Sequence, residues 1–193
     1  MLNIVIFGAP GSGKGTQSEL IIEKYGLHHI STGEILRTEI ENRTKLGLMA
    51  EEYICNGHLV PDRLIIDMLG EIIDKSTNKK GFIFDGFPRT IAQAQALDTL
   101  LKSRNDSISA VLYLSLEEQD LIHRLLKRGE ESSRSDDNME TIQKRLAVYK
   151  EQTEPLKEYY LKKGELFKIK GNGTIDEIFE NIAEVIDRLH VSI

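Results

Sequence analysis

The sequence is poor in the residues that build covalent or metal-linked frameworks: its 193 residues include one cysteine, Cys55, and no tryptophan. A single cysteine excludes an internal disulfide bond and a zinc site made of several cysteines. The apolar run at residues 2–7 has no basic lead and is too short for a signal peptide or a membrane span. We therefore expect a protein of a reducing compartment, the cytoplasm, that does not associate with a membrane.

Positive charge is also scarce. The chain has 25 basic and 31 acidic residues, which gives a net charge of −6. Nucleic acids and anionic membrane surfaces favour basic proteins, so neither is expected as a partner. Any site for a phosphate group must then gather its cations locally. The remaining composition, 40% hydrophobic and 29% charged, is ordinary for a soluble enzyme, and the length suits one α/β domain with a small insert.

Short apolar runs alternate with helical patterns, which is typical of a parallel sheet covered by helices on both faces. The predicted strands are residues 2–7, 28–30, 81–84, 109–114 and 165–169. The predicted helices are residues 14–25, 61–74, 90–103, 117–128, 140–162 and 174–190. No repeat or linker divides the sequence, so residues 1–193 are expected to form a single domain.

Two stretches depart from this alternation. Residues 31–60 are expected to hold two short helices in an insert at the carboxyl edge of the sheet. Residues 129–138 are polar, contain no apolar residue and interrupt two predicted helices. This polar stretch is either an ordinary solvated loop or a flap that moves over a site.

The segment between the first predicted strand and helix has the composition of a phosphate cradle. Gly8, Gly13 and Lys14 fit the P-loop motif, with a strand before it and a helix after it. Glycines let backbone N–H groups turn inward, the helix adds its positive N-terminal end, and the lysine adds a cation for the β- and γ-phosphates. P-loops usually carry Ser or Thr after the lysine as a Mg²⁺ ligand. Here Gly15 takes that place and Thr16 follows, so the metal contact of Thr16 is left open.

A carboxylate at the end of a neighbouring strand is a second feature of P-loop proteins. Asp85 ends the apolar run at residues 81–84. An aspartate in this place lies beside the cradle and orients Mg²⁺ or its waters; the alternative is an aspartate that only ends a strand. We predict the magnesium role for Asp85.

Four arginines flank the polar stretch. Arg124 and Arg128 are four residues apart and share a helix face, with no acidic partner in the local sequence. Arg134 lies within the stretch, and Arg145 belongs to the next predicted helix. Arginine is preferred where a phosphate is bound through two parallel hydrogen bonds. Each of these arginines alone could be a surface residue, but four around one stretch predict a set of phosphate ligands.

Two further candidates have a local explanation. Thr90-x-x-Gln93 fits a capping box in which Gln93 reaches back to the Thr90 N–H, and Ser31-x-x-Glu34 has the same form beside Thr32. From spacing alone, capping is the favoured interpretation for Gln93 and Thr32.

Five ordered runs resemble the adenylate kinases, in their short-lid form, along nearly the whole chain. The matching runs are GAPGSGKGTQ at 8–17, STGEILR at 31–37, NGHLVPD at 56–62, FDGFPRTIAQA at 84–94 and RLLKRGEESSRSDDN at 124–138. The resemblance implies a P-loop three-layer α/β fold with a five-stranded parallel sheet, an AMP-binding insert at residues 31–60 and a short lid at residues 127–137. It also implies transfer of the γ-phosphoryl group of MgATP to AMP, giving two ADP, by a monomer without zinc.

The resemblance also implies roles for individual residues. Those implied in catalysis are Lys14, Arg89, Arg128, Arg134 and Arg145. Those implied in ATP binding are Gly11, Ser12, Gly13, Lys14, Gly15, Thr16, Arg124, Arg128 and Gly173. Those implied in AMP binding are Thr32, Arg37, His58, Leu59, Val60, Gly86, Phe87, Pro88, Arg89, Gln93, Arg134 and Arg145. Mg²⁺ would be held near Asp85 through water. In this interpretation Thr32 and Gln93 can each cap a helix with one group and face the pocket with another.

Two other functions fit parts of the sequence. A pyrimidine (UMP/CMP-type) nucleoside monophosphate kinase has a similar fold, but those relatives carry Ala in place of Thr32 and Asn in place of Gln93. An amide of the length of Gln93 can read the adenine edge, which favours AMP. A P-loop module that senses or hydrolyses ATP has no acceptor, whereas this sequence retains Thr32, Arg37, Arg89 and Gln93 for one.

Overall fold

A five-stranded parallel sheet forms the centre of the structure, a computed structural model that describes residues 1–77, 80–131 and 136–190. In spatial order the strands are β2 (His28–Ser31), β3 (Phe82–Asp85), β1 (Ile4–Gly8), β4 (Ala110–Ser115) and β5 (Leu166–Lys170). The five predicted strands are confirmed, with their ends shifted by one or two residues. The predicted α/β class with a five-stranded parallel sheet is confirmed as well.

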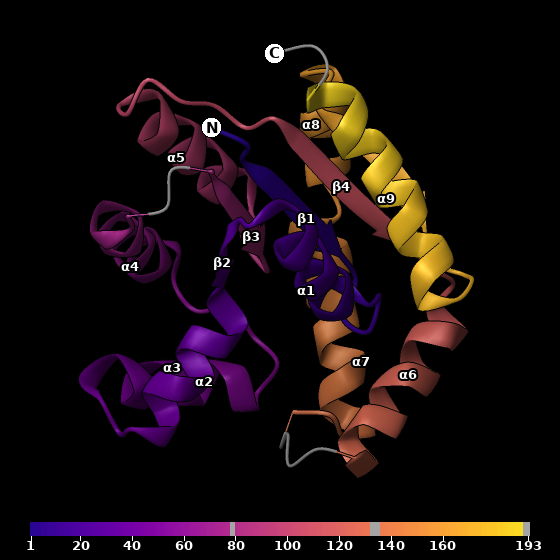
Figure 1. Ribbon diagram of the computed structural model, residues 1–193. Coiled ribbons are helices and arrows are strands. Elements are labelled where there is room, and N and C mark those ends of the chain that lie inside the picture. Colours follow the sequence, from indigo (N-terminus) through magenta and orange to yellow (C-terminus); the bar gives the residue numbers. More distant parts are fainter. Residues whose placement is uncertain (78–79, 132–135, 191–193) are drawn as a thin grey trace.

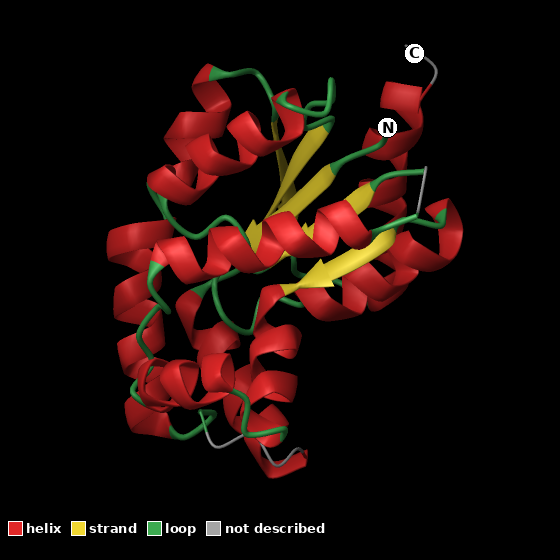
Figure 2. Cartoon of the chain, turned by 90° about the vertical axis from the view of Figure 1, so that its left-hand side faces the viewer, coloured by secondary structure: helices red, strands yellow, loops and turns green. Residues whose placement is uncertain are grey.

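The helices are α1 (Lys14–Tyr25), α2 (Thr32–Glu41), α3 (Lys45–Cys55), α4 (Asp62–Lys75), α5 (Ile91–Lys102), α6 (Glu118–Glu131), α7 (Met139–Val148), the π-helix η1 (Tyr149–Thr153), α8 (Leu156–Lys162) and α9 (Ile175–His190). They cover both faces of the sheet because the strands are apolar on both sides (Figure 2). Val5 and Phe7 of β1 pack with α4, α5 and α8, while Ile4 and Ile6 pack with α1 and α9. Within the described residues, no helix combines the length and apolarity needed to cross a bilayer.

The register of the sheet brings several chain segments to one edge. Asp85 at the end of β3 is aligned with Ile6 of β1 and with Ser31 of β2. Because all the strands are parallel, the loops that follow β1, β2 and β3 meet at the same side. The chain crosses from one side of β1 to the other between β3 and β4, and open α/β sheets bind ligands at such a switch point.

The prediction of one helix over residues 140–162 is wrong in its middle. The segment is divided into α7, η1 and α8. Pro155 has no N–H for the carbonyl group of Glu151, and its ring crowds the preceding turn. The hydrogen bonds widen there, so that the N–H of Glu154 donates to the carbonyl oxygen of Tyr149 at 2.8 Å. Widened turns of this kind are frequent at functional sites.

The polar stretch at residues 129–138 is also shorter than predicted. Helix α6 continues to Glu131, and Lys127 and Glu131 form an ion pair one helical turn apart at 3.7 Å. Residues 132–135, with Arg134 among them, lie outside the described residues.

Two helix pairs extend from the same end of the sheet, on opposite sides (Figure 1). Helices α2 and α3 follow β2, which confirms the two short helices predicted within residues 31–60, and α6 and α7 follow β4. The pair α2–α3 is packed backbone against backbone. A Cβ atom on Gly47 of α3 would lie 2.0 Å from the carbonyl oxygen of Glu39 in α2.

This contact generates a prediction about two helical glycines. We expect Gly47→Ala to lower the free energy of unfolding by about 1–3 kcal/mol, because the methyl group meets backbone atoms that cannot move aside. Gly70 of α4 has no atom within 4 Å of its Cβ position. The matched control Gly70→Ala should therefore raise stability by up to about 1 kcal/mol. Urea unfolding of both variants measures the difference, and similar effects at the two positions would contradict the packing described.

Candidate active site

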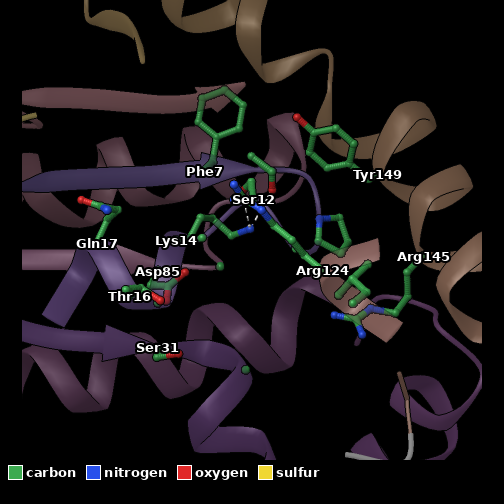
Figure 3. A pocket seen from close by; sticks show the side chains of 18 of the residues that line it. Phe7, Ser12, Lys14, Thr16, Gln17, Ser31, Asp85, Arg124, Arg145 and Tyr149 are labelled. Carbon is green, nitrogen blue, oxygen red and sulfur yellow. Dashed lines mark hydrogen bonds between the residues drawn. The ribbon is translucent and has the colours of Figure 1, made fainter. Parts of the chain in front are cut away.

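A cleft of about 600 Å³ opens at the carboxyl edge of the sheet, lined by residues of α2, α6 and α7 and by the loop after β1 (Figure 3). This volume is within the range of small-molecule sites. Its position at the switch point is the one expected for a ligand in this class of sheet.

The loop after β1 depends on two glycines. Gly13 precedes α1 with a φ of 93°, in the left-handed region that favours glycine. A Cβ atom on Gly8 would lie 2.5 Å from the carbonyl oxygen of Leu114 in β4, so the loop begins close against the sheet. The side chain of Lys14 folds back towards Ser12 (Figure 3). Its ammonium group donates to the carbonyl oxygens of Gly8 at 2.8 Å and Ala9 at 3.0 Å. The glycines and the lysine of the predicted cradle therefore lie together in the wall of the cleft.

The ammonium group of Lys14 lies in a site that disfavours its charge. Burial lowers the pKa of Lys14 to about 8; Asp85 raises it, whereas Arg89, Arg145 and Arg128 lower it. An anion bound beside Lys14 would favour the charged form and raise this pKa again. The electrostatics of the cleft therefore favour a negatively charged ligand beside Lys14.

The carboxylate of Asp85 lies in the cleft, at the end of β3, with 9% of the residue exposed. Its Oδ2 atom is 3.8 Å from Nε2 of His29 in β2, and Asp85 raises the pKa of His29. In the described parts of the chain, no three His, Cys, Asp or Glu side chains gather as a metal site. One carboxylate suits Mg²⁺, which keeps several waters and takes further ligands from substrate phosphates. Thr16 is exposed and lines the same cleft.

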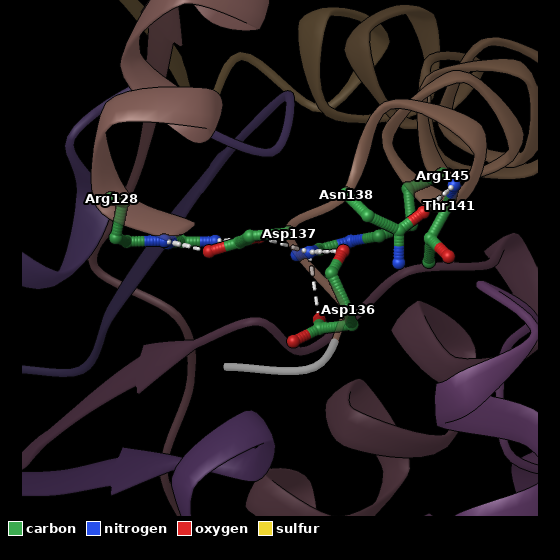
Figure 4. Close-up of polar contacts among 6 residues, drawn as sticks. All are labelled: Arg128, Asp136, Asp137, Asn138, Thr141 and Arg145. Atoms are coloured by element: carbon green, nitrogen blue, oxygen red, sulfur yellow. Dashed lines mark hydrogen bonds and ion pairs between the residues drawn. The ribbon is translucent and has the colours of Figure 1, made fainter. Parts of the chain in front are cut away.

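Two arginines on the other side of the cleft are held by carboxylates (Figure 4). Nε and Nη2 of Arg128 donate to the two carboxylate oxygens of Asp137 at 2.6 and 2.7 Å. Nη1 of Arg145 lies 2.9 Å from Asp137 Oδ1 and 2.7 Å from Asp136 Oδ2. The search for an acidic partner in the local sequence of Arg128 missed Asp137, which stands nine residues further on, in the segment that leads into α7.

A smaller cavity of about 80 Å³ adjoins the cleft, and Arg89 and Arg145 line both. The carbonyl oxygen of Gly86 accepts from Thr32 Oγ1 at 2.9 Å and from Arg89 Nε at 2.7 Å. Burial lowers the pKa of Arg89 to about 10, and Arg145 lowers it as well. A guanidinium group whose charge is disfavoured in this way is stabilised by an anion, so the junction of the two cavities favours a negative group.

The two predicted capping boxes differ from the structure. Thr90 does cap α5, since its Oγ1 accepts from the Gln93 N–H at 3.1 Å. However, Oε1 of Gln93 accepts from the N–H of Arg89 at 2.7 Å, one residue earlier than predicted. Ser31 precedes α2 without a side-chain capping bond. Both Thr32 and Gln93 line the smaller cavity, so capping alone does not describe either residue.

Comparison with known proteins identifies the family. Residues 6–165 match the family model described as adenylate kinase. The chain is 64% identical to the adenylate kinase of Azobacteroides pseudotrichonymphae, over 98% of this chain and 99% of that relative. It is 58% identical to that of Bacteroides fragilis, over 98% of this chain and all of that relative, and 54% identical to that of Porphyromonas gingivalis, over 97% of each.

The chain belongs to the adenylate kinase family. Adenylate kinases interconvert ATP plus AMP with two ADP, and this is the activity of the chain. The two alternatives, a pyrimidine nucleoside monophosphate kinase and a P-loop module without an acceptor, are thereby set aside.

The residues that the resemblance to adenylate kinases implied fall into two groups in space. The residues expected at ATP all line the larger cleft: Gly11, Ser12, Gly13, Lys14, Gly15, Thr16, Arg124, Arg128 and Gly173. Most of those expected at AMP line the smaller cavity: Thr32, Arg37, His58, Leu59, Val60, Gly86, Arg89, Gln93 and Arg145. Pro88 lines the larger cleft, whereas Phe87 is 1% exposed in the core and lines neither. Arg134 lies outside the described residues.

The sequence patterns did not indicate the contacts of several residues near the site. Asp136 and Asp137 lie within a run that matched adenylate kinases, but nothing in their spacing indicated that they bind arginines. His29 lies in the strand predicted at residues 28–30, and nothing in that run indicated an acidic partner. The signal that could have found it is the pairing of β2 with β3, which aligns His29 two residues from the level of Asp85.

Removing the charge of Lys14 should impair adenylate kinase activity without unfolding the protein. We expect Lys14→Met to lower kcat/KM by at least about 100-fold, because the cation expected to meet the phosphates is lost. At pH 7 the free energy of unfolding of this variant should exceed that of the wild type by on the order of 1 kcal/mol, because a partly buried charge is removed. Water in the cleft screens that charge and keeps the gain this small.

The pH dependence of this gain follows from the pKa of Lys14. That pKa is about 8 in the folded chain against an ordinary value of 10.5. The cost of the buried charge is therefore fully present below pH 8 and is relieved as the pH rises from 8 towards 10.5. Urea unfolding at pH 7 and pH 10 should show the stability gain of the variant shrinking at the higher pH. A variant clearly less stable than the wild type at pH 7 would contradict this.

Proposed function

We propose that ATP binds in the larger cleft against the loop after β1 and that AMP binds in the smaller cavity, with their phosphates meeting at Arg89 and Arg145. The observation that carries this proposal is that the two cavities adjoin and share three cationic residues, Arg37, Arg89 and Arg145. Phosphoryl transfer needs alignment and charge stabilisation more than covalent work by the protein. Two sites that open onto one cationic junction satisfy both needs.

On the donor side, the backbone N–H groups of residues 11–16 and the ammonium group of Lys14 hold the β- and γ-phosphates. Arg124 would lie near the ATP base. Its Nη2 donates to the carbonyl oxygen of Gly171 at 3.1 Å, and its Nη1 is 3.8 Å from the Cβ position of Gly13. Gly173 meets the base through its backbone.

On the acceptor side, Arg37 and Arg89 hold the phosphate of AMP as the in-line nucleophile. Gly86 supports this arrangement, because its carbonyl oxygen fixes the guanidinium group of Arg89 and the hydroxyl group of Thr32 together. Gln93 and residues 58–60 receive the nucleoside. No general base is required, since the AMP phosphate is already ionised at neutral pH.

The charge that spreads over the transferring group is met by Arg128 and Arg145, with Arg134 as a third cation. We propose residues 127–137 as a lid over ATP and residues 31–60 as the AMP-binding insert. The positions of α6–α7 and α2–α3 on opposite sides of the cleft support this division. Closure of the lid excludes water, which would otherwise accept the phosphoryl group.

We propose Asp85 as the protein group that holds Mg²⁺ through water, with Thr16 beside it. When bound with ATP, the ion would neutralise part of the negative charge of the phosphates. We also propose that the chain acts as a monomer, because one chain supplies both cavities. We propose the cytoplasm as its compartment, because the exposed, free thiol of Cys55 remains reduced there.

The proposal is tested by supplying the purified protein and Mg²⁺ with ATP, with AMP, or with both, and measuring ADP. ADP should form rapidly only when both nucleotides are present. ADP formed from ATP alone at the same rate would show an ATPase, and rates with UMP or CMP equal to the rate with AMP would show a different acceptor.

A substitution of Arg89 tests the shared junction. We expect Arg89→Ala to lower kcat/KM for AMP by at least about 100-fold, because a charge-assisted contact to the acceptor phosphate is lost. The affinity for ATP, measured by direct titration, should change much less. Arg63→Ala is the matched control, since the side chain of Arg63 is 92% exposed on α4 and forms only a surface ion pair with Asp67, at 3.8 Å. Unchanged kinetics with AMP in Arg89→Ala would refute the assignment.

A further inference from the structure

The carboxamide group of Gln93 is held from both ends by the protein. Gln93 is 2% exposed and lines the smaller cavity. Its Oε1 atom accepts from the N–H of Arg89 at 2.7 Å, and its Nε2 atom donates to Oδ1 of Asp62 at 2.7 Å. A carboxamide has two donors on nitrogen and two acceptor sites on oxygen. One donor and one acceptor site of Gln93 therefore remain for a ligand.

These two contacts determine which way the carboxamide group faces. If it were turned by 180°, Nε2 would face the N–H of Arg89 and Oε1 would face the carboxylate of Asp62. Two donors would then oppose each other at one end and two acceptors at the other, which buried groups avoid. The amide is thus held in one orientation, with its oxygen towards Arg89 and its nitrogen towards Asp62.

Asp62 is itself fixed in place. Its Oδ2 atom accepts from the hydroxyl group of Thr90 at 2.9 Å, and Thr90 caps the helix that carries Gln93. Asp62 is partly buried at the first turn of α4 and lines neither cavity. The carboxylate is therefore placed to act on a ligand through Gln93 and not by direct contact.

We propose that Asp62 is a positioning residue that sets the base specificity of the acceptor site through the orientation of Gln93; this inference rests on the proposed binding of AMP in the smaller cavity. The pairing edge of adenine offers an acceptor at N1 and a donor at the 6-amino group. A 6-oxopurine has the same shape but offers a donor at N1 and an acceptor at O6. A carboxamide in one orientation pairs with adenine, and the same group turned by 180° pairs with the 6-oxopurine. An amide that cannot turn therefore selects the 6-aminopurine.

The test compares AMP with inosine monophosphate, a 6-oxopurine nucleotide, as acceptors at saturating ATP. In Asp62→Ala the Nε2 end of Gln93 loses its fixed acceptor. The ratio of kcat/KM for AMP to that for inosine monophosphate should fall by about tenfold or more. The change should come mainly from a higher KM for AMP, with kcat and the KM for ATP little changed. Because the N–H of Arg89 still favours the native orientation of Gln93, this ratio should fall but stay above 1, so that AMP remains the preferred acceptor.

Two further Asp variants separate this role from a general loss of structure. Asp62→Asn keeps the size of the side chain and one acceptor, so its ratio should lie between those of the wild type and Asp62→Ala; it carries the test alone if the alanine variant does not fold. Asp67→Ala removes a carboxylate from the exposed side of the same helix and should leave the ratio unchanged.

Gln93→Leu distinguishes the inference from the proposed function. If Gln93→Leu raises the KM for AMP but both Asp62 variants keep the wild-type ratio, the positioning role of Asp62 is overturned while the proposed AMP site stands. If Gln93→Leu leaves the KM for AMP unchanged, the proposed position of the adenine base fails, and the inference fails with it.

Discussion

Concentrated positive charge in an otherwise acidic chain is the constraint on which this structure depends. Lys14, Arg89, Arg128 and Arg145 come from separate elements, yet the three arginines all lower the pKa of the lysine. Like charges in a poorly solvated site repel each other, so something rigid must hold them together. The parallel sheet and the loop after β1 do this together. One face of the sheet packs against α1, which carries Lys14, and Ala9 of the loop after β1 packs with α6 and α7, which carry Arg128 and Arg145. The net charge of −6 is compatible with such a site because acidic side chains stand next to specific cations and donors.

Those acidic side chains have three distinct tasks. Asp85 lies beside Lys14 and His29. The arginines of α6 and α7 are bound by Asp136 and Asp137. The third task belongs to Asp62, which binds the uncharged amide of Gln93. Each one limits the positions open to its partner, because charge-assisted hydrogen bonds are short and directional. The geometry of the cleft is in this way set as much by these aspartates as by the cations that line it.

Local sequence signals predicted the parts of the fold and site in which neighbouring residues act together. The glycines and lysine after β1, the five strands and the cap at Thr90 are of this kind. The division of the helix before Pro155 was missed, because Ile142, Leu146 and Tyr149 keep a helical spacing while only the backbone hydrogen bonds change. The partners of Arg128 and Gln93 were missed for another reason. They lie 9 and 31 residues away in the chain, and their contacts depend on how α7 follows α6 and how α4 meets α5.

The pairs between α6 and α7 have a consequence for turnover. Because Asp136 and Asp137 already bind Arg128 and Arg145, a phosphate that binds at the proposed site would replace one anion by another. The free energy gained on binding the phosphate would then be the difference between two charge-assisted interactions, which is smaller than either one alone. When ADP departs from the proposed site, the aspartates would bind the guanidinium groups again, so that product release would leave no unpaired charge. Such a balance suits a reversible enzyme, since neither substrates nor products would be held too tightly to leave.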